Sequence, residues 1–524
     1  MRFICMRDLD RTDGTVVLHK TSTGESSASI VLHPQPSPND PNDPLRWPLW
    51  QKHVAFASVC AFTFLTNFGI GGLAPAFYIL SIEFDKTMDE ISHLLLYPIL
   101  VLGAFNFFWV PMANYFGKRP VFVVASGLLC ASYIWGAVAT SYGSLLGSNI
   151  VAAFAGSSTE ALGASMVNDL YFLHERGAKM GIYMNAIAGG NTVGPLVCGF
   201  IVSNLSWRWQ KWISVIFTAL NFLTILLFVP ETRYRREIGR DSVASCTPND
   251  TPNERIAVTD DKSPQGSSTR VSLNQLPKKT WRKNLSLWSG TAETNLAKMF
   301  VRPFPMIVYP AAIYAFLCYS ISLVLTVAVN ILNPFVLQAP PYNWSPQING
   351  LINIPGILGN MFGSWAGGDL VDMWCKWRTK KYLGIYEPES RLYMVAIPLV
   401  LTTAGCILFG YGVQNALPWI SLFFGYGMVS VSLTALPTIT MAYASDCAYP
   451  VNSDVLLLIN GLKNIVAFGF LYGVVPWVNN DGYVNAFGAM AGIFAGVVTL
   501  GAVLLIRYGA NARHAAAQWK VILE

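Results

Sequence analysis

The sequence predicts an all-α membrane protein with twelve transmembrane helices arranged as two six-helix bundles. Two observations lead to this prediction. Of the 524 residues, 53% are hydrophobic and only 12% are charged, whereas soluble domains carry about 25% charged residues. Apolar stretches of about 20 residues, the length that crosses a bilayer as a helix, recur twelve times along the chain.

The chain begins with a segment rich in Ser, Thr, Pro and Asp that has no apolar core. Residues 1–50 are therefore expected to form a disordered cytosolic tail and not a cleaved signal peptide. Six predicted spans follow, at about 53–80, 92–112, 121–140, 144–169, 180–203 and 210–230. Together they define an N-terminal bundle over residues 51–230.

A polar stretch separates the two halves. Residues 231–302 are rich in Ser, Thr, Asn and Pro, a composition typical of a flexible linker. Six more spans then follow, at about 306–336, 346–370, 392–412, 418–443, 453–476 and 484–507. They define a C-terminal bundle over residues 303–508, and residues 509–524 are expected to form a cytosolic tail.

Basic residues of the loops indicate the orientation. Most lie on one side: Lys118, Arg119, Arg176, Lys179, Arg233, Arg235, Arg236, Lys278, Lys279, Lys376, Arg378, Lys380 and Lys381. The opposite loops carry little beyond Lys86, Arg208 and Lys211. The positive-inside rule then places both termini and the linker in the cytosol. Because topology explains the net charge of +6, no nucleic-acid partner is expected.

Enzymatic motifs are not found in the sequence. The nine cysteines are scattered singly, unlike disulfide frameworks or zinc sites, and the six histidines do not cluster. The chain has no phosphate-binding Walker loop, HExxH, GxSxG or haem-binding spacing. We therefore expect no enzyme activity, cofactor or metal, and an energy source other than ATP.

The fifth span carries an unusual cluster of helix breakers, GGNTVGPLVCGFI over residues 189–201. A broken helix is tolerated in lipid where neighbouring helices shield the backbone, and glycines at four-residue spacing let helices approach closely. Gly190, Gly194, Pro195 and Gly199 are therefore expected to form a bend and a smooth packing face.

The stretch from Gly190 to Gly199 resembles the span-five motif of antiporters in the major facilitator superfamily. Further motifs occur in the expected loops: NDPLRWP (42–48), NYFGKRP (114–120), NDLYFLHERG (168–177), WRW (207–209), PETRY (230–234), GDLVD (368–372) and GIYEPESRL (384–392). Together they resemble the fungal drug:proton antiporter branch over residues 40–508.

This resemblance implies two bundles that close alternately around a central site near the midplane. It also implies a cytosolic gate. Its first half would unite Asp169, Glu175, Arg176 and Glu231, next to Asn114, Gly117 and Arg119 of the loop after span two. Its second half would unite Asp372, Glu387, Glu389 and Arg391. Two residues depart from the family pattern: Asn114 replaces an Asp and Asn149 replaces an Arg, so two charges tied to gating and proton coupling are missing.

Charges inside the spans are candidates to replace them. Glu160 lies eleven residues after Asn149, on almost the same helix face and about 16 Å along the axis. Burial there would favour the protonated carboxyl that a proton carrier requires, whereas the alternative is a Glu neutralised by a neighbouring helix. Lys463 shares one face with Asn460 and Asn464. It could pair with a substrate carboxylate, with Glu160 or with backbone carbonyls.

Asparagines recur within the spans, including Asn67 in span one and a stripe of Asn349, Asn353 and Asn360 in span eight. They could line a polar cavity or join helices through hydrogen bonds. Asp446 and Asp454 flank the loop between spans ten and eleven, and we expect them at the membrane interface.

Three functional hypotheses follow. The first is a proton-coupled exporter of small amphipathic compounds such as drugs, toxins or fungal secondary metabolites. The second is a transporter of organic cations such as polyamines, and the third is a membrane sensor that binds without transport. The expected partners are a small-molecule substrate, protons and the lipid bilayer, with the protein a monomer in the plasma membrane.

Overall fold

The structure is a computed structural model. It describes residues 42–173, 175–232, 295–338, 342–381, 385–448 and 451–523, with short pieces at 3–5, 16–17, 19–20, 29–30, 40, 285–286 and 340. Most of the expected N-terminal tail and of the expected linker lies outside these residues.

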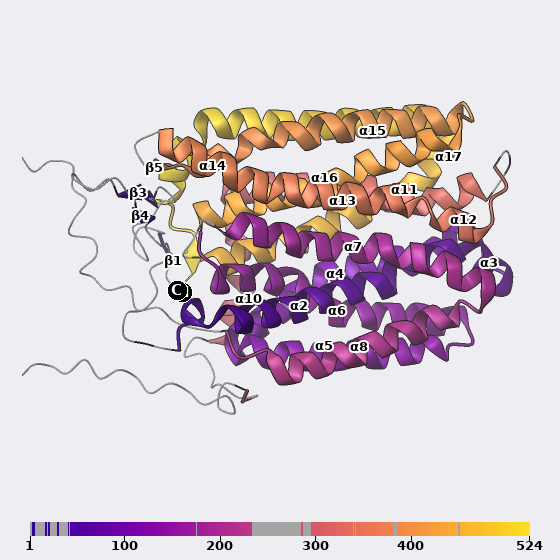
Figure 1. The fold of residues 1–524 in the computed structure, drawn as a ribbon, viewed down its shortest axis with the longest axis horizontal. Helices are drawn as coiled ribbons and strands as arrows, with labels where there is room; N and C mark the ends of the chain where they lie inside the picture. Colours follow the sequence, from indigo (N-terminus) through magenta and orange to yellow (C-terminus); the bar gives the residue numbers. More distant parts are fainter. Residues whose placement is uncertain are drawn as a thin grey trace, which may run out of the picture.

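The first half of the chain forms six long helices that lie side by side (Figure 1). They are α2 (Leu49–Gly71), α4 (Met88–Phe116), α5 (Lys118–Ala137), α6 (Tyr142–Leu170), α7 (Arg176–Asn204) and α8 (Arg208–Phe228). The short elements η1 (Pro44–Arg46), η2 (Ala74–Ala76) and α3 (Phe77–Glu83) flank α2.

The second half begins with α10 (Leu296–Val301) and η4 (Phe304–Val308). Its other helices are α11 (Pro310–Leu337), α12 (Pro346–Gly350), α13 (Asn353–Gly367), α14 (Asp369–Lys381), η5 (Pro388–Val395), α15 (Ala396–Gln414), α16 (Trp419–Cys447) and α17 (Asn452–Ala516). The helix α17 contains two predicted spans, which meet at Gly482, where φ is 80°.

Ten helices in the described part of the chain are long and apolar enough to cross a membrane. Because α17 supplies two of the spans and α12 with α13 covers the eighth, the helices account for all twelve predicted spans. The prediction of an all-α fold with two six-helix bundles is confirmed.

Helix ends follow local signals. Thr87 begins α4 with a capping box, in which its hydroxyl accepts from the backbone N–H of Glu90 and the Glu90 carboxylate accepts from that of Thr87. Ser141 caps α6 through a hydrogen bond from Ser144 N–H. Gly117 alone separates α4 from α5, and its φ of 110° lies in the region that favours glycine.

The termini and most of the motif-bearing loops gather at one end of the helices, called the tail side below, whereas WRW (207–209) lies at the opposite end between α7 and α8 (Figure 1). Here short antiparallel strands join distant parts of the chain. β1 (Phe3–Ile4) pairs with β6 (Ile522–Leu523), and β2 (Val16–Val17) pairs with β5 (Ile385–Tyr386). The last helix continues past the expected boundary at residue 508 to Ala516, because Arg513 is buried and pairs with Glu389 at 3.1 Å.

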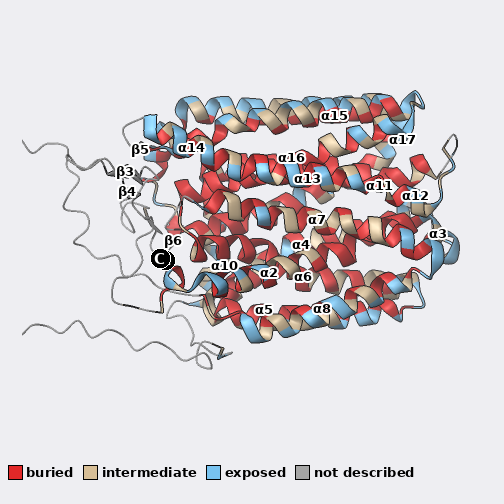
Figure 2. Cartoon of the chain, viewed as in Figure 1, coloured by how far each residue is buried: buried red, intermediate tan, exposed pale blue. Residues whose placement is uncertain are grey.

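Two sets of helices join the bundles. α7 packs against α12, α13 and α16, and α4 packs against α17. Buried residues concentrate along these central helices, whereas α8 and α15 each expose one face, as expected for helices that face lipid (Figure 2). Buried polar residues of α4, α6 and α17, among them Asn106, Glu160 and Lys463, therefore lie between the bundles.

Candidate functional site

A buried polar cluster joins the two bundles near their centre. Glu160 of α6 lies 3.1 Å from the ammonium of Lys463 on α17. Its other oxygen accepts from Asn464 Nδ2 at 2.6 Å and from Asn106 Nδ2 at 3.2 Å. Of the three pairings predicted for Lys463, the structure has the one with Glu160. Each charge is paired and hydrogen-bonded, which burial of an ion pair requires.

An aromatic ring completes the surroundings of Lys463. Its ammonium lies 4.2 Å from the ring centroid of Tyr319 on α11, close enough for a cation–π interaction. Lys463 is therefore held by both bundles, through Glu160 of the first and Tyr319 of the second.

The cluster lines a small cavity of about 30 Å³ between the bundles. The polar lining consists of Asn67, Glu160, Asn191, Asn330, Lys463 and Asn464, and the apolar lining includes Ile70, Leu95, Ile99, Leu102, Ile187, Leu323 and Val327. A volume of this size holds a few water molecules at most. The protein is thus closed around its central site.

Other predicted asparagines lie outside this cavity. Asn353 Oδ1 accepts from Tyr426 OH at 3.4 Å. Asn460 donates to its own helix at Leu456 O. Asn360 lines a separate hollow between α2, α7 and α13. The stripe of asparagines in span eight therefore does not line the central cavity.

A lysine of α8 lies beside Asn149, where the family pattern has an Arg, and the sequence did not indicate this contact. Asn149 Oδ1 accepts from Lys211 Nζ at 2.7 Å, and Lys211 is fully buried. The prediction that Lys211 belongs to a loop was wrong, because α8 begins at Arg208 and carries Lys211 into the bundle within its first turn.

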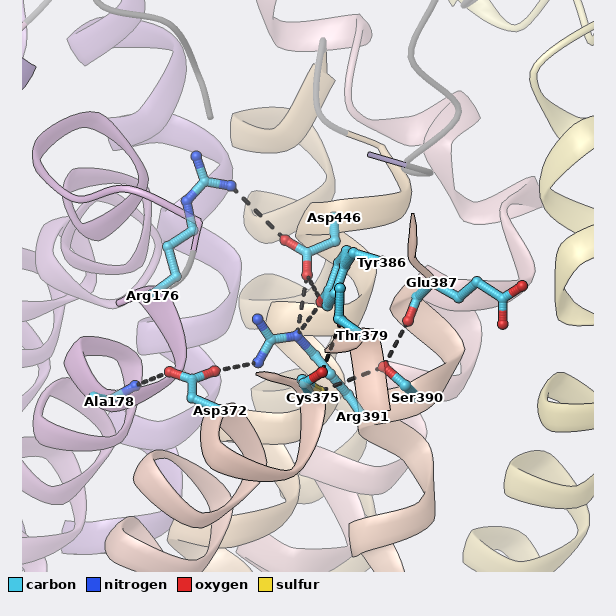
Figure 3. A network of polar contacts seen from close by, with 10 residues as sticks. All are labelled: Arg176, Ala178, Asp372, Cys375, Thr379, Tyr386, Glu387, Ser390, Arg391 and Asp446. Atoms are coloured by element: carbon cyan, nitrogen blue, oxygen red, sulfur yellow. Dashed lines mark hydrogen bonds and ion pairs between the residues drawn. The ribbon is translucent and has the colours of Figure 1, made fainter. Parts of the chain in front are cut away.

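On the tail side a second network crosses the bundle interface (Figure 3). Arg391 pairs with Asp372 at 2.8 Å and with Asp446 at 3.1 Å. Asp446 also lies 3.8 Å from Arg176 of the first bundle. Asp372 accepts from the backbone N–H of Ala178, at the start of α7. Two carboxylates of the second bundle therefore contact the N-terminal turn of α7.

Asp372 lies outside the membrane-spanning helices, and its titration follows from its surroundings. Burial raises the pKa of Asp372 above its usual value, while the nearby Arg391 guanidinium and the Ala178 N–H act in the opposite direction. The carboxyl therefore takes up a proton at a higher pH than an exposed Asp does.

Members of the predicted gate do not form a single network. Arg176, Asp372 and Arg391 join the cross-bundle network, together with Asp446 and with Tyr386, which the sequence did not single out. Glu389 pairs with Arg513 instead. Glu387 is exposed, and its carboxylate points away from the network in Figure 3.

The remaining gate residues lie within the first bundle. The Glu231 carboxylate accepts from the backbone N–H groups of Lys118 and Arg119, both at 3.1 Å, a favourable place for an anion at the N-terminus of α5. Asp169 pairs with Lys118. Asn114 is half-buried two residues before the end of α4, and the carbonyl of Glu175 accepts from Lys179 N–H in the first turn of α7.

The glycine motif of α7 brings three helices together. A Cβ at Gly190 would lie 2.4 Å from Phe64 O, and one at Gly194 would lie 2.9 Å from Gly72 Cα. A Cβ at Gly199 would lie 2.8 Å from Pro346 O, across the bundle interface. The motif therefore allows close contact with α2 and with α12, and α7 remains one helix through Pro195.

Comparisons with known proteins agree with this architecture. Residues 59–467 match the sequence profile of the Major Facilitator Superfamily. The chain is 24% identical to Protein HOL1 of Saccharomyces cerevisiae, over 96% of this chain and 93% of HOL1. It is also 24% identical to the probable efflux pump mfs2 of Aspergillus flavus, over 84% of this chain and 98% of that protein.

Solved structures share the fold. The proton:xylose symporter XylE superposes with a TM-score of 0.58 at 12% identity, covering 88% of this chain and 96% of XylE. The profile match extends over most of the described helices, from α2 to the first part of α17. The chain therefore belongs to the Major Facilitator Superfamily, a family of membrane transporters and not of enzymes.

Proposed function

We propose that this transporter is a proton-coupled exporter of small amphipathic compounds that works by alternating access. The observation that carries the proposal is the ion pair between Glu160 and Lys463, because it joins the two bundles at the central cavity. An ionisable pair inside the membrane is expensive to bury, so its presence at the interface indicates a functional role.

The pair supplies a means of coupling. A proton on Glu160 cancels the carboxylate charge and removes the attraction to Lys463. The bundles can then separate on one side, and a substrate group can take the place of one partner. When the proton leaves, the pair forms again and the substrate is excluded. Leaving one member of a buried pair without its partner costs about 3–5 kcal/mol, enough to shift the balance between two conformations.

The cavity lining supports an amphipathic substrate. Amide groups of Asn67, Asn191 and Asn330 line the cavity together with aliphatic side chains. Such a mixture suits a ligand with both apolar and hydrogen-bonding parts. Export is favoured by the likeness to the Aspergillus protein, which is described as a probable efflux pump.

The proposal includes an orientation. With the tail side in the cytosol, the basic loop residues follow the positive-inside rule. The network of Arg176, Asp372, Arg391 and Asp446 would then be the cytosolic gate, in a monomer in the plasma membrane.

A polyamine substrate is the second candidate. Glu160 is the one carboxylate among the described residues that line the cavity, and an organic cation could displace Lys463 from it. A sensor that binds without transport remains the third hypothesis, and the experiment below distinguishes all three.

The test uses proteoliposomes with an acidic interior and a pH-sensitive dye, challenged with ethidium, fluconazole and spermidine. The proposal expects discharge of the gradient by an amphipathic compound in the parent protein and no discharge in Glu160→Gln. Glu83→Gln, which changes a half-exposed carboxylate paired with Arg208, is the matched control. Response to spermidine alone would favour the polyamine transporter, and binding without discharge would favour the sensor.

A further inference from the structure

A second buried lysine lies in the first bundle, apart from the central ion pair. Lys211 of α8 has no exposed surface. Its Nζ donates to Asn149 Oδ1 of α6 at 2.7 Å and to Gly69 O of α2 at 2.8 Å. The same nitrogen lies 5.3 Å from the ring centroid of Tyr133 on α5. One side chain thus connects four helices.

All of these partners are neutral. The titratable groups near Lys211 are Tyr133 of α5 and Cys198 of α7, and the Tyr133 hydroxyl already donates to Leu65 O and Thr66 O. Among the described residues no carboxylate contacts Lys211. Burial without a counter-ion penalises the charged form of an amine, and two neutral oxygen acceptors offset only part of that penalty.

The geometry couples this proton to helix positions. Asn149 also donates to Leu94 O of α4 at 3.2 Å. The neighbouring residues Leu95 of α4 and Ile70 and Gly71 of α2 line the central cavity. Opening of the cavity would therefore bring water close to Gly69 and Asn149, the two residues that hold Lys211.

We propose that Lys211 is a proton-binding site whose occupancy follows the conformation of the first bundle. In the closed state the dry surroundings favour the neutral amine, which donates to Asn149 Oδ1 and Gly69 O. When the helices separate and water reaches Lys211, the amine takes up one proton and becomes an ammonium, and it gives that proton back when they close. This inference rests on the proton coupling proposed above and adds a site distinct from Glu160.

Two measurements test it on the full-length protein. The first is NMR of ¹⁵Nζ-labelled lysine in nanodiscs, with the Lys211 signal identified by its loss in Lys211→Arg. We expect that signal to change from ammonium to amine between mildly acidic and mildly alkaline pH. A signal that stays ammonium over the whole range overturns the inference. If Lys211→Arg does not fold, Lys211→Gln identifies the signal.

The second measurement is discharge of the pH gradient by ethidium, fluconazole and spermidine. Arginine preserves the charge and the hydrogen bonds but does not release its proton. Lys211→Arg is therefore expected to lose discharge, while Lys86→Arg, the same change in a half-exposed surface pair, keeps it. Discharge by Lys211→Arg equal to that of the parent would show a structural role only and overturn the inference. A parent that responds to no compound argues against the proposed function, and the NMR titration still decides whether Lys211 binds a proton.

Discussion

The carboxylate of Glu160 lies 3.1 Å from the ammonium of Lys463, although 303 residues separate them in the sequence. Each residue belongs to a different bundle, so the pair measures how closely the bundles approach. Any conformation that opens the cavity must lengthen this distance.

Replacing one residue of this ion pair should therefore destabilise the protein more than replacing both. Glu160→Gln or Lys463→Met alone leaves a buried charge unpaired and should destabilise the protein by about 3–5 kcal/mol. The double variant should recover much of that loss. Unfolding of the purified variants in detergent measures the difference, and additive losses would contradict a direct interaction.

Gly199 should control how closely α7 and α12 approach at the end of the protein opposite the tail side. A larger side chain there meets Pro346 O and Gly350 of the second bundle. Gly199→Leu is therefore expected to hold α7 and α12 apart and to abolish transport. Spin labels at the exposed residues Ile82 and Ile348 report the distance. Gly473→Leu, at a position with nothing within 4 Å, should leave the distance unchanged.

The tail-side network should respond to acid. Because burial raises the pKa of Asp372, its charged form is lost as the pH falls through a value above that of an exposed Asp. The effect of this raised pKa on the free energy of unfolding has the opposite direction. The protonated carboxyl stabilises the folded protein at low pH, and this contribution is lost as the pH rises through the folded pKa. Acid should therefore weaken the contacts of Asp372 with Arg391 and Ala178 before it unfolds the protein.

Spin labels at the exposed residues Leu49 and Met373 measure that weakening as a longer distance at lower pH. Asp372→Asn should show the longer distance at every pH, whereas Asp369→Asn, at an exposed position of α14, should behave like the parent. A distance that does not depend on pH in the parent would contradict the assignment.

The turn between α4 and α5 should depend on Gly117. Its φ of 110° is unfavourable for a residue with a Cβ, and Gly117→Ala should cost about 1–3 kcal/mol of stability. Gly143→Ala, in open space near the start of α6, should cost nothing. Equal melting temperatures for the two variants would show that the loop adapts.

Much of the fold could be predicted because its signals are local. A span is recognised from about 20 consecutive residues, and a loop motif from a short run such as NYFGKRP at residues 114–120. The twelve spans, their division into two halves and the family motifs all depend on such short-range patterns. Glu160 and Lys463 could be singled out for the same reason, since a charge inside an apolar run is visible without knowledge of its neighbours.

Partners across the interface could not be read in this way. The sequence left three possible partners for Lys463, and the packing of α6 against α17 selected Glu160. The sequence counted Lys211 among the loop charges, although the predicted sixth span begins at residue 210 and α8 carries this lysine to Asn149. It also gave no reason to connect Tyr386 with Asp446. These contacts join residues far apart in the sequence, so they depend on how whole helices pack, and a short stretch of sequence carries no information about its distant neighbours.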